Sequence, residues 1–283
     1  MMNVLNDSSS VCSKERVYSQ HQAAMTLLQN RLKKPSVDDF HWIDIACGQG
    51  QILTNLENIL GADLRKKVTF HAFDVDKDSL KVAIELANSL AFNKVKDKVG
   101  QIEDFHPLMG EHKFDFITLT NSIHEFEPYG IPAVFIDLLS HLRPDGLLYV
   151  FDMEQLTSPE LGAIAWNRTE ITKILCDIFK HLSVKDYVPE ASDWPLSSIR
   201  AWSVQIDMVH ISKGISITTE SRAEAIRATK GLIESLLKKK LELCAKTLKA
   251  LKENRPDSAA EKLIRDNAVF DFWALNDVIG GQK

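Results

Sequence analysis

The feature that most constrains the fold is a short apolar run that ends in a glycine-rich turn. Residues 41–46 read His-Trp-Ile-Asp-Ile-Ala, residues 47–50 read Cys-Gly-Gln-Gly, and an amphipathic pattern follows over residues 52–60. This succession predicts a buried strand that enters a helix through a tight turn. A glycine in such a turn has no Cβ, so a ligand can approach the backbone closely. We therefore expect a ligand site at the carboxyl end of this strand.

Strand and helix patterns alternate along most of the chain. Such alternation predicts a mainly parallel, doubly wound α/β sheet, whose edge is closed by two late strands as an antiparallel pair. The predicted strands are residues 41–46, 68–74, 99–102, 114–120, 147–152 (after a turn at 143–146), 182–188 and 199–211. The predicted helices before residue 180 are residues 15–32, 52–60, 80–90, 131–142 and 170–179.

The chain is predicted to have three segments. Residues 1–14 are polar and rich in serine, which is typical of a flexible arm. Residues 15–215 hold the α/β pattern and form the main domain, and residues 216–283 form a helical extension. The extension has a long helical pattern from Glu220 to Glu253, a break at Pro256 and a short final helix.

The composition narrows the class of protein. A net charge of −5 argues against non-specific nucleic-acid binding by the whole molecule. The four cysteines are far apart without a Cys-x-x-Cys pair, so we expect reduced thiols rather than disulfides or a zinc site. The N-terminus has no secretory signal pattern, and no stretch reaches the roughly 18 apolar residues of a membrane span, so we expect a cytoplasmic protein without a membrane partner. No set of His and carboxylate residues has metal-ligand spacing, so no catalytic metal is expected.

An acidic residue, Asp74, ends the second predicted strand. A carboxylate at this position of a parallel sheet can accept hydrogen bonds from both hydroxyls of a ribose. Alternatively, Asp74 only caps the following helix, a role for which Asp76 and Asp78 are equally suited. The first turn is poorly suited to a dinucleotide, because Leu53 stands where that fingerprint needs a small residue.

Five segments, in this order, resemble the motifs of class I S-adenosylmethionine (AdoMet)-dependent methyltransferases. The resemblance covers roughly residues 38–155. It implies a Rossmann-like, seven-stranded sheet with an antiparallel last strand, and AdoMet as the cofactor. The matching segments are the run from Asp44 to Gly50, the strand end with Asp74, Glu103-Asp104-Phe105, the fourth strand with its exit Asn121-Ser122-Ile123-His124-Glu125, and the turn Leu142-Arg143-Pro144-Asp145-Gly146.

The resemblance also implies which residues hold AdoMet. Asp44 would orient the methionine part, Asp74 would bind the ribose, and Asp104 would face the adenine amino group; an acid in a loop without a ligand is the alternative for Asp104. On the first helix, Tyr18 and Gln22 match a lid that some small-molecule members place over the carboxylate of AdoMet; a plain surface helix is the alternative. The full set of expected cofactor residues is Asp44, Ala46, Gly48, Gly50, Asp74, Val75, Glu103, Asp104, Asn121, Tyr18 and Gln22.

The exit of the fourth strand is expected to supply the catalytic groups, because this loop faces the methyl group in the family. Methyl transfer is an in-line displacement, so the protein aligns the reactants and removes a proton from a hydroxyl or thiol acceptor. His124 has a suitable pKa range for that base, with Glu125 or another acid holding its tautomer. The alternative is that His124 only packs. The Asn/Asp-Pro-Pro-Tyr/Phe element of many exocyclic-amine methyltransferases is absent, which disfavours N-methylation of bases.

Two later regions bear on the acceptor. Trp166, Trp194 and Trp202 lie where the family builds its acceptor pocket; packing of a sheet edge is the alternative. Apolar residues at helical spacing along residues 226–251 form a stripe that would dock on the protein's own sheet or on another subunit. Residues 222–255 also hold ten Lys or Arg against four Glu, a basic face that would suit RNA or another anionic partner.

The leading hypothesis is an AdoMet-dependent methyltransferase that acts on a small or medium-sized acceptor, most readily at oxygen, with sulfur and nitrogen open. One alternative is an RNA or protein methyltransferase that holds its substrate with the basic C-terminal helix. Another is a non-catalytic AdoMet-binding module that works as an interaction protein. A homodimer through the C-terminal helix is compatible with each of them. An NAD-dependent oxidoreductase is least favoured, because of Leu53.

Overall fold

A computed structural model describes residues 19–34, 39–196, 199–253 and 258–281. The predicted arm (residues 1–14) and Tyr18 lie outside these ranges. The chain divides into two compact units, and the predicted domain boundary at residue 215 stays a prediction. The first unit comprises Met1–Thr120, Asp137–Val150 and Gln205–Ser212, and the second comprises Asn121–Ile136, Phe151–Val204 and Lys213–Lys283.

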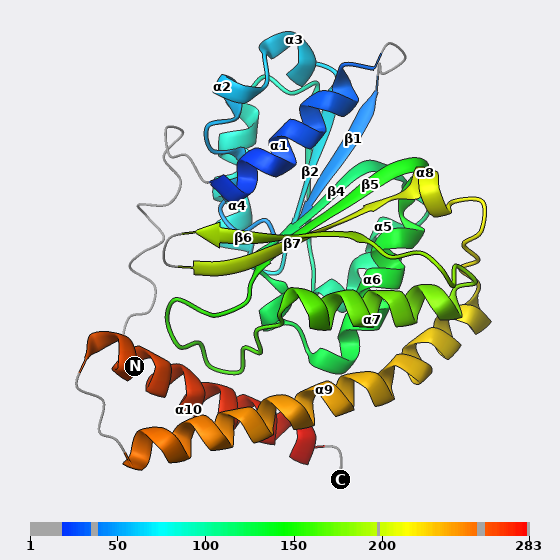
Figure 1. Ribbon diagram of the computed structural model, residues 1–283. Helices are drawn as coiled ribbons and strands as arrows, with labels where there is room; N and C mark the ends of the chain where they lie inside the picture. Colours follow the sequence, from blue (N-terminus) through cyan, green and yellow to red (C-terminus); the bar gives the residue numbers. More distant parts are fainter. Residues whose placement is uncertain (1–18, 35–38, 197–198, 254–257, 282–283) are drawn as a thin grey trace. The chain divides into compact units, whose positions relative to one another are not determined.

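Seven strands form one sheet in the order β3-β2-β1-β4-β5-β7-β6 (Figure 1). β1 pairs in parallel with β2 and with β4, and β2 pairs in parallel with β3. The sheet, its flanking helices and the C-terminal helices confirm the predicted fold class. The strands are β1 (Phe40–Ile45), β2 (Val68–Asp74), β3 (Lys94–Val99), β4 (Phe114–Thr120), β5 (Leu142–Met153), β6 (Glu190–Leu196) and β7 (Ile199–Asp207).

Most main helices follow the predicted periodicity, with ends that differ by a few residues. The final helix was predicted to be short, but α10 (Ala259–Gly280) has 22 residues. In the first unit, α4 packs on β2 and β3 and buries Leu80, Ala83 and Ala87. The longer helices are α1 (Ser19–Leu32), α4 (Lys77–Asn88), α6 (Ile131–Ser140), α7 (Arg168–His181), α9 (Thr219–Glu253) and α10 (Ala259–Gly280). Shorter elements are η4 (Ile102–Asp104), α5 (Phe105–Met109), η5 (Ile123–Glu125), η6 (Pro128–Gly130) and α8 (Met208–Ile211).

The core of the first unit is built on two strands that are buried at every position, β1 and β2. The ring of Trp42 meets the ring of Phe70 edge-on at 4.7 Å and lies 6.3 Å from that of Phe116. Full burial of a phenylalanine side chain stabilises a fold by about 1.5–3 kcal/mol, so this aromatic layer holds the three neighbouring strands together. Strands buried on both faces are typical of a parallel sheet.

The strand predicted at residues 99–102 is instead β3, which ends at Val99. β3 stands at one end of the strand order, and most of its side chains, including those of Lys94, Lys96 and Lys98, are exposed. Charged residues are common on edge strands because they discourage pairing with other chains. Such a strand carries no apolar pattern, which is why the sequence places it wrongly.

The single helix predicted over residues 52–60 is broken into η3 (Gln51–Leu53) and α2 (Leu56–Ile59), with α3 (Ala62–Arg65) next. Thr54 is extended and Asn55 has a left-handed backbone with φ of 59°, so the helical path stops between them. Asparagine adopts this conformation more readily than most residues. The glycine-rich turn therefore leads into short helical pieces and not into a long helix.

Two further strands differ from their predicted limits. No strand covers residues 182–188; the strand lies at β6, which contains Pro195. Proline normally argues against a strand, but β6 is the other end of the strand order, where a missing N–H is tolerated. β5 begins at Leu142, so the predicted turn at 143–146 belongs to the strand.

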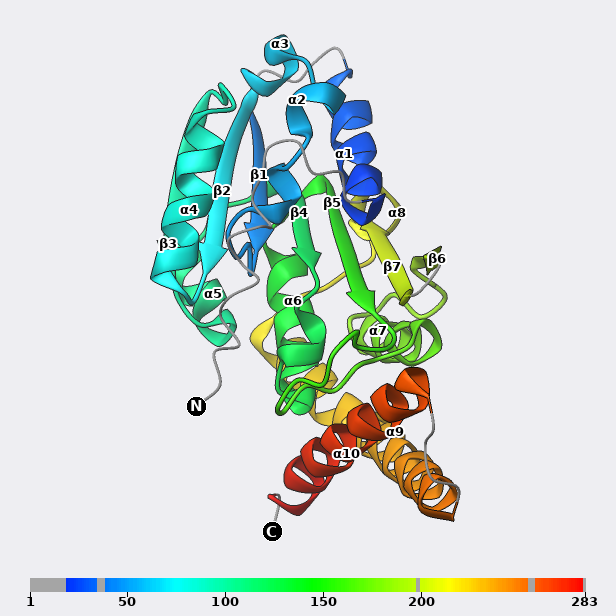
Figure 2. The same ribbon diagram turned by 90° about the vertical axis from the view of Figure 1, so that its left-hand side faces the viewer.

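The C-terminal helices pack on helices of the second unit. α9 contacts α7 and α10, and Ile233 and Leu237 of the predicted stripe are buried. α9 and α10 pack against each other and cross in both Figure 1 and Figure 2. Within the described residues, no helix combines the length and the apolar character that a membrane crossing needs.

Candidate functional site

Asp44, near the end of β1, is a buried acid with one hydrogen-bond chain behind it. The hydroxyl of Thr118 donates to Asp44 Oδ1 at 2.6 Å, and Trp42 Nε1 donates to that hydroxyl at 2.9 Å. Only 2% of Asp44 is exposed. β1 and β4 place these side chains together, because Asp44 and Thr118 are register partners. The carboxylate is thus held in one orientation.

The turn after β1 has an unusual backbone. Ala46, Gly48 and Gly50 have φ values of 50°, 51° and 83°. Left-handed backbone is costly for residues with a Cβ, which explains the two glycines. At Gly50 space matters too, because a Cβ there would lie 3.2 Å from the Cα of Ala83 in α4. The turn can therefore follow this path only with glycine at that position.

Asp74, at the end of β2, is tied to the turn. Its Oδ2 accepts from the Gly48 N–H at 2.7 Å, and its Oδ1 accepts from the Asp76 N–H at 2.8 Å. The residue that caps α4 is Asp76, whose side chain accepts from the Asp78 and Ser79 N–H groups. The helix-capping alternative therefore belongs to Asp76 and not to Asp74.

The remaining predicted cofactor residues lie in varied environments. Val75 is 55% exposed, and Glu103 and Asp104 are exposed in η4. Gln22 is exposed on α1. Asn121 has a left-handed backbone with φ of 57°, and its N–H donates to the Phe151 carbonyl at 2.8 Å within the second unit. The cofactor-binding roles of all these residues stay predictions.

The electrostatics of Asp44 suit a cationic ligand group. Burial raises its pKa to about 7; the Thr118 hydrogen bond lowers it, and the negative charge of Asp74 raises it further. No ion pair joins Asp44 to a basic side chain in the part of the chain that the structure describes. A buried carboxyl group in this state gains from a nearby positive charge. The ammonium and sulfonium groups of AdoMet carry such a charge, so the residues present fit this cofactor.

The second unit holds a buried histidine between acids. His124 is 2% exposed; its Nδ1 lies 2.7 Å from Asp152 Oδ1, and its Nε2 lies 3.3 Å from Glu160 Oε2. The predicted partner, Glu125, is 3.8 Å from Nε2, so Asp152 and not Glu125 fixes the ring. Burial opposes the charge, but the hydrogen bonds and charges of Asp152 and Glu160 raise the pKa of His124 to about 10.

Sequence reasoning missed Asp152 and Glu160 as functional candidates. One signal was present, because Asp152 is an acid near the carboxyl end of β5, just where Asp74 lies in β2. Glu160 lies in a stretch without regular structure, and nothing in its surroundings along the sequence marks it. Only the folded chain brings it to His124.

The predicted acceptor region contains a groove of about 670 Å³. Trp194 lines it, and its Nε1 donates to the Ser203 hydroxyl at 2.8 Å. Trp166 and Trp202 are buried and joined by a 2.5 Å hydrogen bond from Trp202 Nε1 to the Trp166 carbonyl. For these two tryptophans, packing is therefore the better interpretation. Other lining residues include Asn167, Arg168, Glu170, Lys173, Arg200 and Lys239.

Comparison with known protein families adds to this geometry. The model of the methyltransferase domain family matches residues 36–188. The chain belongs to this family. The match confirms the resemblance to class I methyltransferases, and with it an enzyme that depends on AdoMet. No curated protein matches the sequence.

Solved structures of other methyltransferases are similar to this one in fold. The CMeT domain of the citrinin polyketide synthase has 17% identity and a TM-score of 0.51, with 66% of this chain and 52% of that chain covered. Magnesium protoporphyrin IX methyltransferase from Synechocystis, with bound S-adenosylhomocysteine, has 12% identity, a TM-score of 0.48, and 70% and 91% coverage. An rRNA methylase from Streptococcus thermophilus has 11% identity, a TM-score of 0.47, and 68% and 98% coverage. The likeness to the citrinin synthase domain shows that this methyltransferase shares that fold.

Proposed function

We propose that this methyltransferase transfers the methyl group of AdoMet to an oxygen atom of a small or medium-sized acceptor. When bound, AdoMet supplies a methyl group activated by its sulfonium sulfur. Asp44 holds the ammonium group of the amino acid end, and Asp74 receives the ribose hydroxyls while it keeps the turn in place through Gly48. The observation that carries the proposal is this pair of acids around the glycine turn, in a chain of the methyltransferase family.

The size of the groove in the second unit supports a small or medium-sized acceptor. Ligand pockets for small molecules usually measure about 300–1,000 Å³, and the groove measures about 670 Å³. Arg168 and Asp193 form a 2.9 Å ion pair in its lining, and both side chains are partly exposed, so a polar acceptor can compete for either charge. Trp194 adds an apolar surface on which a flat group would rest.

We assign methylation to an oxygen atom because a hydroxyl acceptor must lose a proton and His124 can take it. With a pKa of about 10, His124 is charged at neutral pH and donates through both ring nitrogens. Glu160 is 40% exposed at its side chain, so an acceptor hydroxyl can replace it at Nε2. Loss of the Glu160 contact lowers the pKa of His124, because that contact raises it. As the pKa falls, the Nε2 proton leaves to Glu160 or to solvent. Asp152 keeps the proton on Nδ1, and the freed Nε2 then accepts the hydroxyl proton.

Cofactor binding tests the first part of the proposal. We expect isothermal titration to show micromolar binding of AdoMet and of S-adenosylhomocysteine. Asp74→Asn should weaken the affinity for both ligands by one to two orders of magnitude, because the ribose hydroxyls then lose hydrogen bonds to a charged acceptor. The matched control is Asp76→Asn, since asparagine caps a helix as well as aspartate does. Equal affinity of the wild type and Asp74→Asn would remove Asp74 from the site.

The pH profile of methyl transfer tests the proton acceptor. Activity that needs an uncharged His124 rises with pH toward about 10 in the wild type. In Glu160→Gln the rising limb should move to lower pH, because the contact that raises the His124 pKa is lost. Glu127→Gln, also an exposed acid, serves as the control. An unchanged profile in Glu160→Gln would show that His124 does not take the acceptor's proton.

A further inference from the structure

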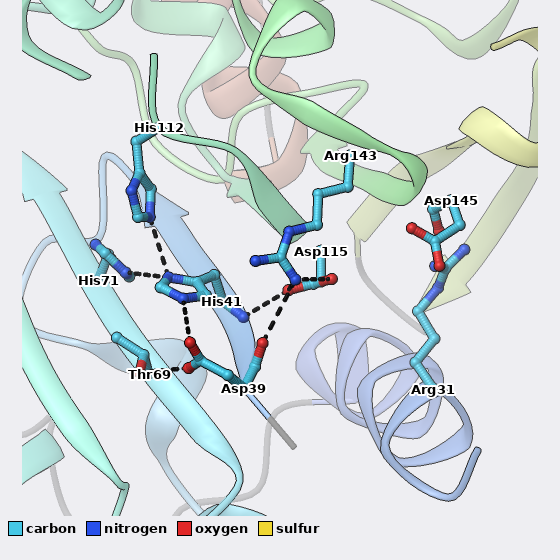
Figure 3. A network of polar contacts seen from close by, with 9 residues as sticks. All are labelled: Arg31, Asp39, His41, Thr69, His71, His112, Asp115, Arg143 and Asp145. Atoms are coloured by element: carbon cyan, nitrogen blue, oxygen red, sulfur yellow. Dashed lines mark hydrogen bonds and ion pairs between the residues drawn. The ribbon is translucent and has the colours of Figure 1, made fainter. Parts of the chain in front are cut away.

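Three histidines from separate parts of the chain converge within the first unit. His41 is in β1, His71 is in β2, and His112 precedes β4 (Figure 3). His41 Nδ1 lies 3.1 Å from His71 Nε2 and 3.0 Å from His112 Nε2. The three rings are mutual neighbours, with centroids 4.8–5.3 Å apart. We call this group the histidine cluster.

Hydrogen bonds within the histidine cluster cannot give every ring nitrogen a good partner. The other ring nitrogen of His41, Nε2, lies 3.1 Å from Asp39 Oδ2 and donates its proton there. His41 Nδ1 then has one lone pair, because a neutral imidazole has one donor and one acceptor nitrogen. His71 and His112 both aim Nε2 at this single lone pair. Two N–H donors cannot both form a good bond with it.

Most of the histidine cluster is shielded from solvent. His41 and His71 are 9% and 8% exposed, and His112 is half-buried. Neutral imidazole is the form that ligates metal ions.

We propose that the histidine cluster binds one divalent transition-metal ion of the zinc class through His41 Nδ1, His71 Nε2 and His112 Nε2. Zinc–nitrogen distances are about 2.0–2.1 Å, so ligand nitrogens in a tetrahedral site lie roughly 3.3 Å apart. The observed separations of 3.0 and 3.1 Å are close to this value. The three atoms lie within 4.8 Å of one another. A water molecule completes the fourth position.

The surroundings of the histidine cluster suit this role. The contact of Asp39 with His41 Nε2 is the carboxylate–histidine arrangement that orients metal ligands and raises their basicity. The Thr69 hydroxyl donates to the other oxygen of Asp39 at 3.3 Å. Lys96 opposes a cation, whereas the charge of Arg143 is balanced by Asp115 at 2.9 Å. Asp39 offsets the remaining positive charge.

The ion would act separately from the cofactor residues. Side chains alternate along a strand, so His41 and Ile43 lie on one face of β1 and Asp44 on the other. In register, His71 is the partner of Ile43 and shares the face of His41. The ion would therefore join β1, β2 and the segment before β4 on that face, and stabilise the first unit without entering methyl transfer.

Metal titration tests the proposal. We expect the EDTA-treated, full-length protein to bind one equivalent of Zn²⁺ in isothermal titration. Co²⁺ should give the intense visible absorption of a tetrahedral site. His71→Asn and His112→Asn should each weaken Zn²⁺ binding at least about tenfold, and Asp39→Asn about 10–100-fold. His112 is only half-buried, so its variant keeps the test valid if His71→Asn misfolds.

Two control variants separate the possible results. His210→Asn removes an exposed imidazole on α8 and should leave Zn²⁺ binding unchanged. Glu160→Gln alters the other group of close ligand atoms, His124, Glu125 and Glu160, and should also leave it unchanged. The proposal fails if the folded protein binds no Zn²⁺. It also fails if binding persists in His112→Asn and is lost in Glu160→Gln.

Discussion

At the scale of single residues, two buried ionisable groups have displaced pKa values for opposite reasons. Burial raises the pKa of Asp44, and few contacts offset this effect. The pKa of His124 is raised because the effect of two carboxylates exceeds the opposite effect of burial. At neutral pH the ionisation of Asp44 lowers the free energy of unfolding, and the charge on His124 raises it. Both states can be measured through the pH dependence of unfolding.

For Asp44, removing the charge should stabilise the protein and weaken cofactor binding. The pKa of Asp44 in the folded protein is about 7, against an ordinary value of 3.8, so stability falls as pH rises from 3.8 to 7. Asp44→Asn should raise the free energy of unfolding by up to about 4 kcal/mol at pH 8 but by only about 2 kcal/mol at pH 5, at about 1.36 kcal/mol per pKa unit. Urea unfolding at the two pH values measures this.

The same variant should lose affinity for AdoMet, and wild-type affinity should rise with pH through about 7 as Asp44 ionises. Thr118→Val is a useful companion, because it keeps the charge and removes the Oδ1 hydrogen bond. If Asp44→Asn binds AdoMet as tightly as the wild type, Asp44 does not contact its positive end.

The contact of His124 with Asp152 should contribute to the free energy of unfolding. The pKa of His124 in the folded protein, about 10, exceeds the ordinary value of 6.5, so the stabilisation is complete below pH 6.5 and is lost as pH rises through about 10. Asp152→Asn should cost about 3 kcal/mol or more at pH 6, because it leaves a buried charge with a weaker partner. The cost should shrink at pH 10. NMR titration of the imidazole would show a lower pKa in the variant, and an unchanged value would contradict this assignment.

At the scale of elements, the glycine turn after β1 depends on both its backbone and its neighbour α4. Gly50→Ala adds a Cβ to a left-handed residue 3.2 Å from the Cα of Ala83. We expect a loss of about 1–3 kcal/mol in the free energy of unfolding, and weaker AdoMet binding as the turn shifts.

Gly61→Ala is the matched control for this change. Gly61 has φ of −59°, and nothing lies within 4 Å of the place where its Cβ would be. Its effect on unfolding should stay within about 0.5 kcal/mol. Thermal unfolding and AdoMet titration of the two variants, side by side, provide the measurement. Equal stability of both would mean that the turn and α4 can separate without cost.

At the scale of the whole molecule, the basic surface of α9 is smaller than its sequence indicates. Lys240 Nζ is 2.6 Å from Glu170 Oε2, donates to the Ala165 carbonyl at 2.8 Å, and lies 5.3 Å from the centre of the Trp166 ring. It therefore holds α9 within the second unit. Lys238 is exposed beside Glu234, and Lys239 is exposed as well.

The RNA alternative is therefore tested with Lys238 and Lys239 alone. We expect labelled RNA to show no salt-sensitive binding in fluorescence anisotropy between about 50 and 200 mM salt. The double variant, Lys238→Gln with Lys239→Gln, should keep its stability and its AdoMet affinity. Binding that falls steeply with salt and disappears in the double variant would instead favour an RNA acceptor. Light scattering on the same samples measures the molar mass and would show whether the protein forms the predicted homodimer.

The local pattern of the sequence was enough to determine the central strands, the glycine turn and the acids that end them. Residues 41–50 and Asp74 are close enough along the chain for periodicity and turn chemistry to mark them, and the order of five such motifs indicated the family. The sequence did not predict the limits of the charged edge strand β3 or the break at Asn55. An exposed edge strand and a single left-handed residue leave no periodic pattern.

Only the tertiary structure decided which distant side chains meet. His124, Asp152 and Glu160 come from separate segments, as do His41, His71 and His112. Their spacing along the sequence has no regularity, because contacts between segments depend on how the strands order and register in the sheet. The same holds for Lys240, whose charge along the sequence suggested a surface, but whose position in the fold ties two helices together.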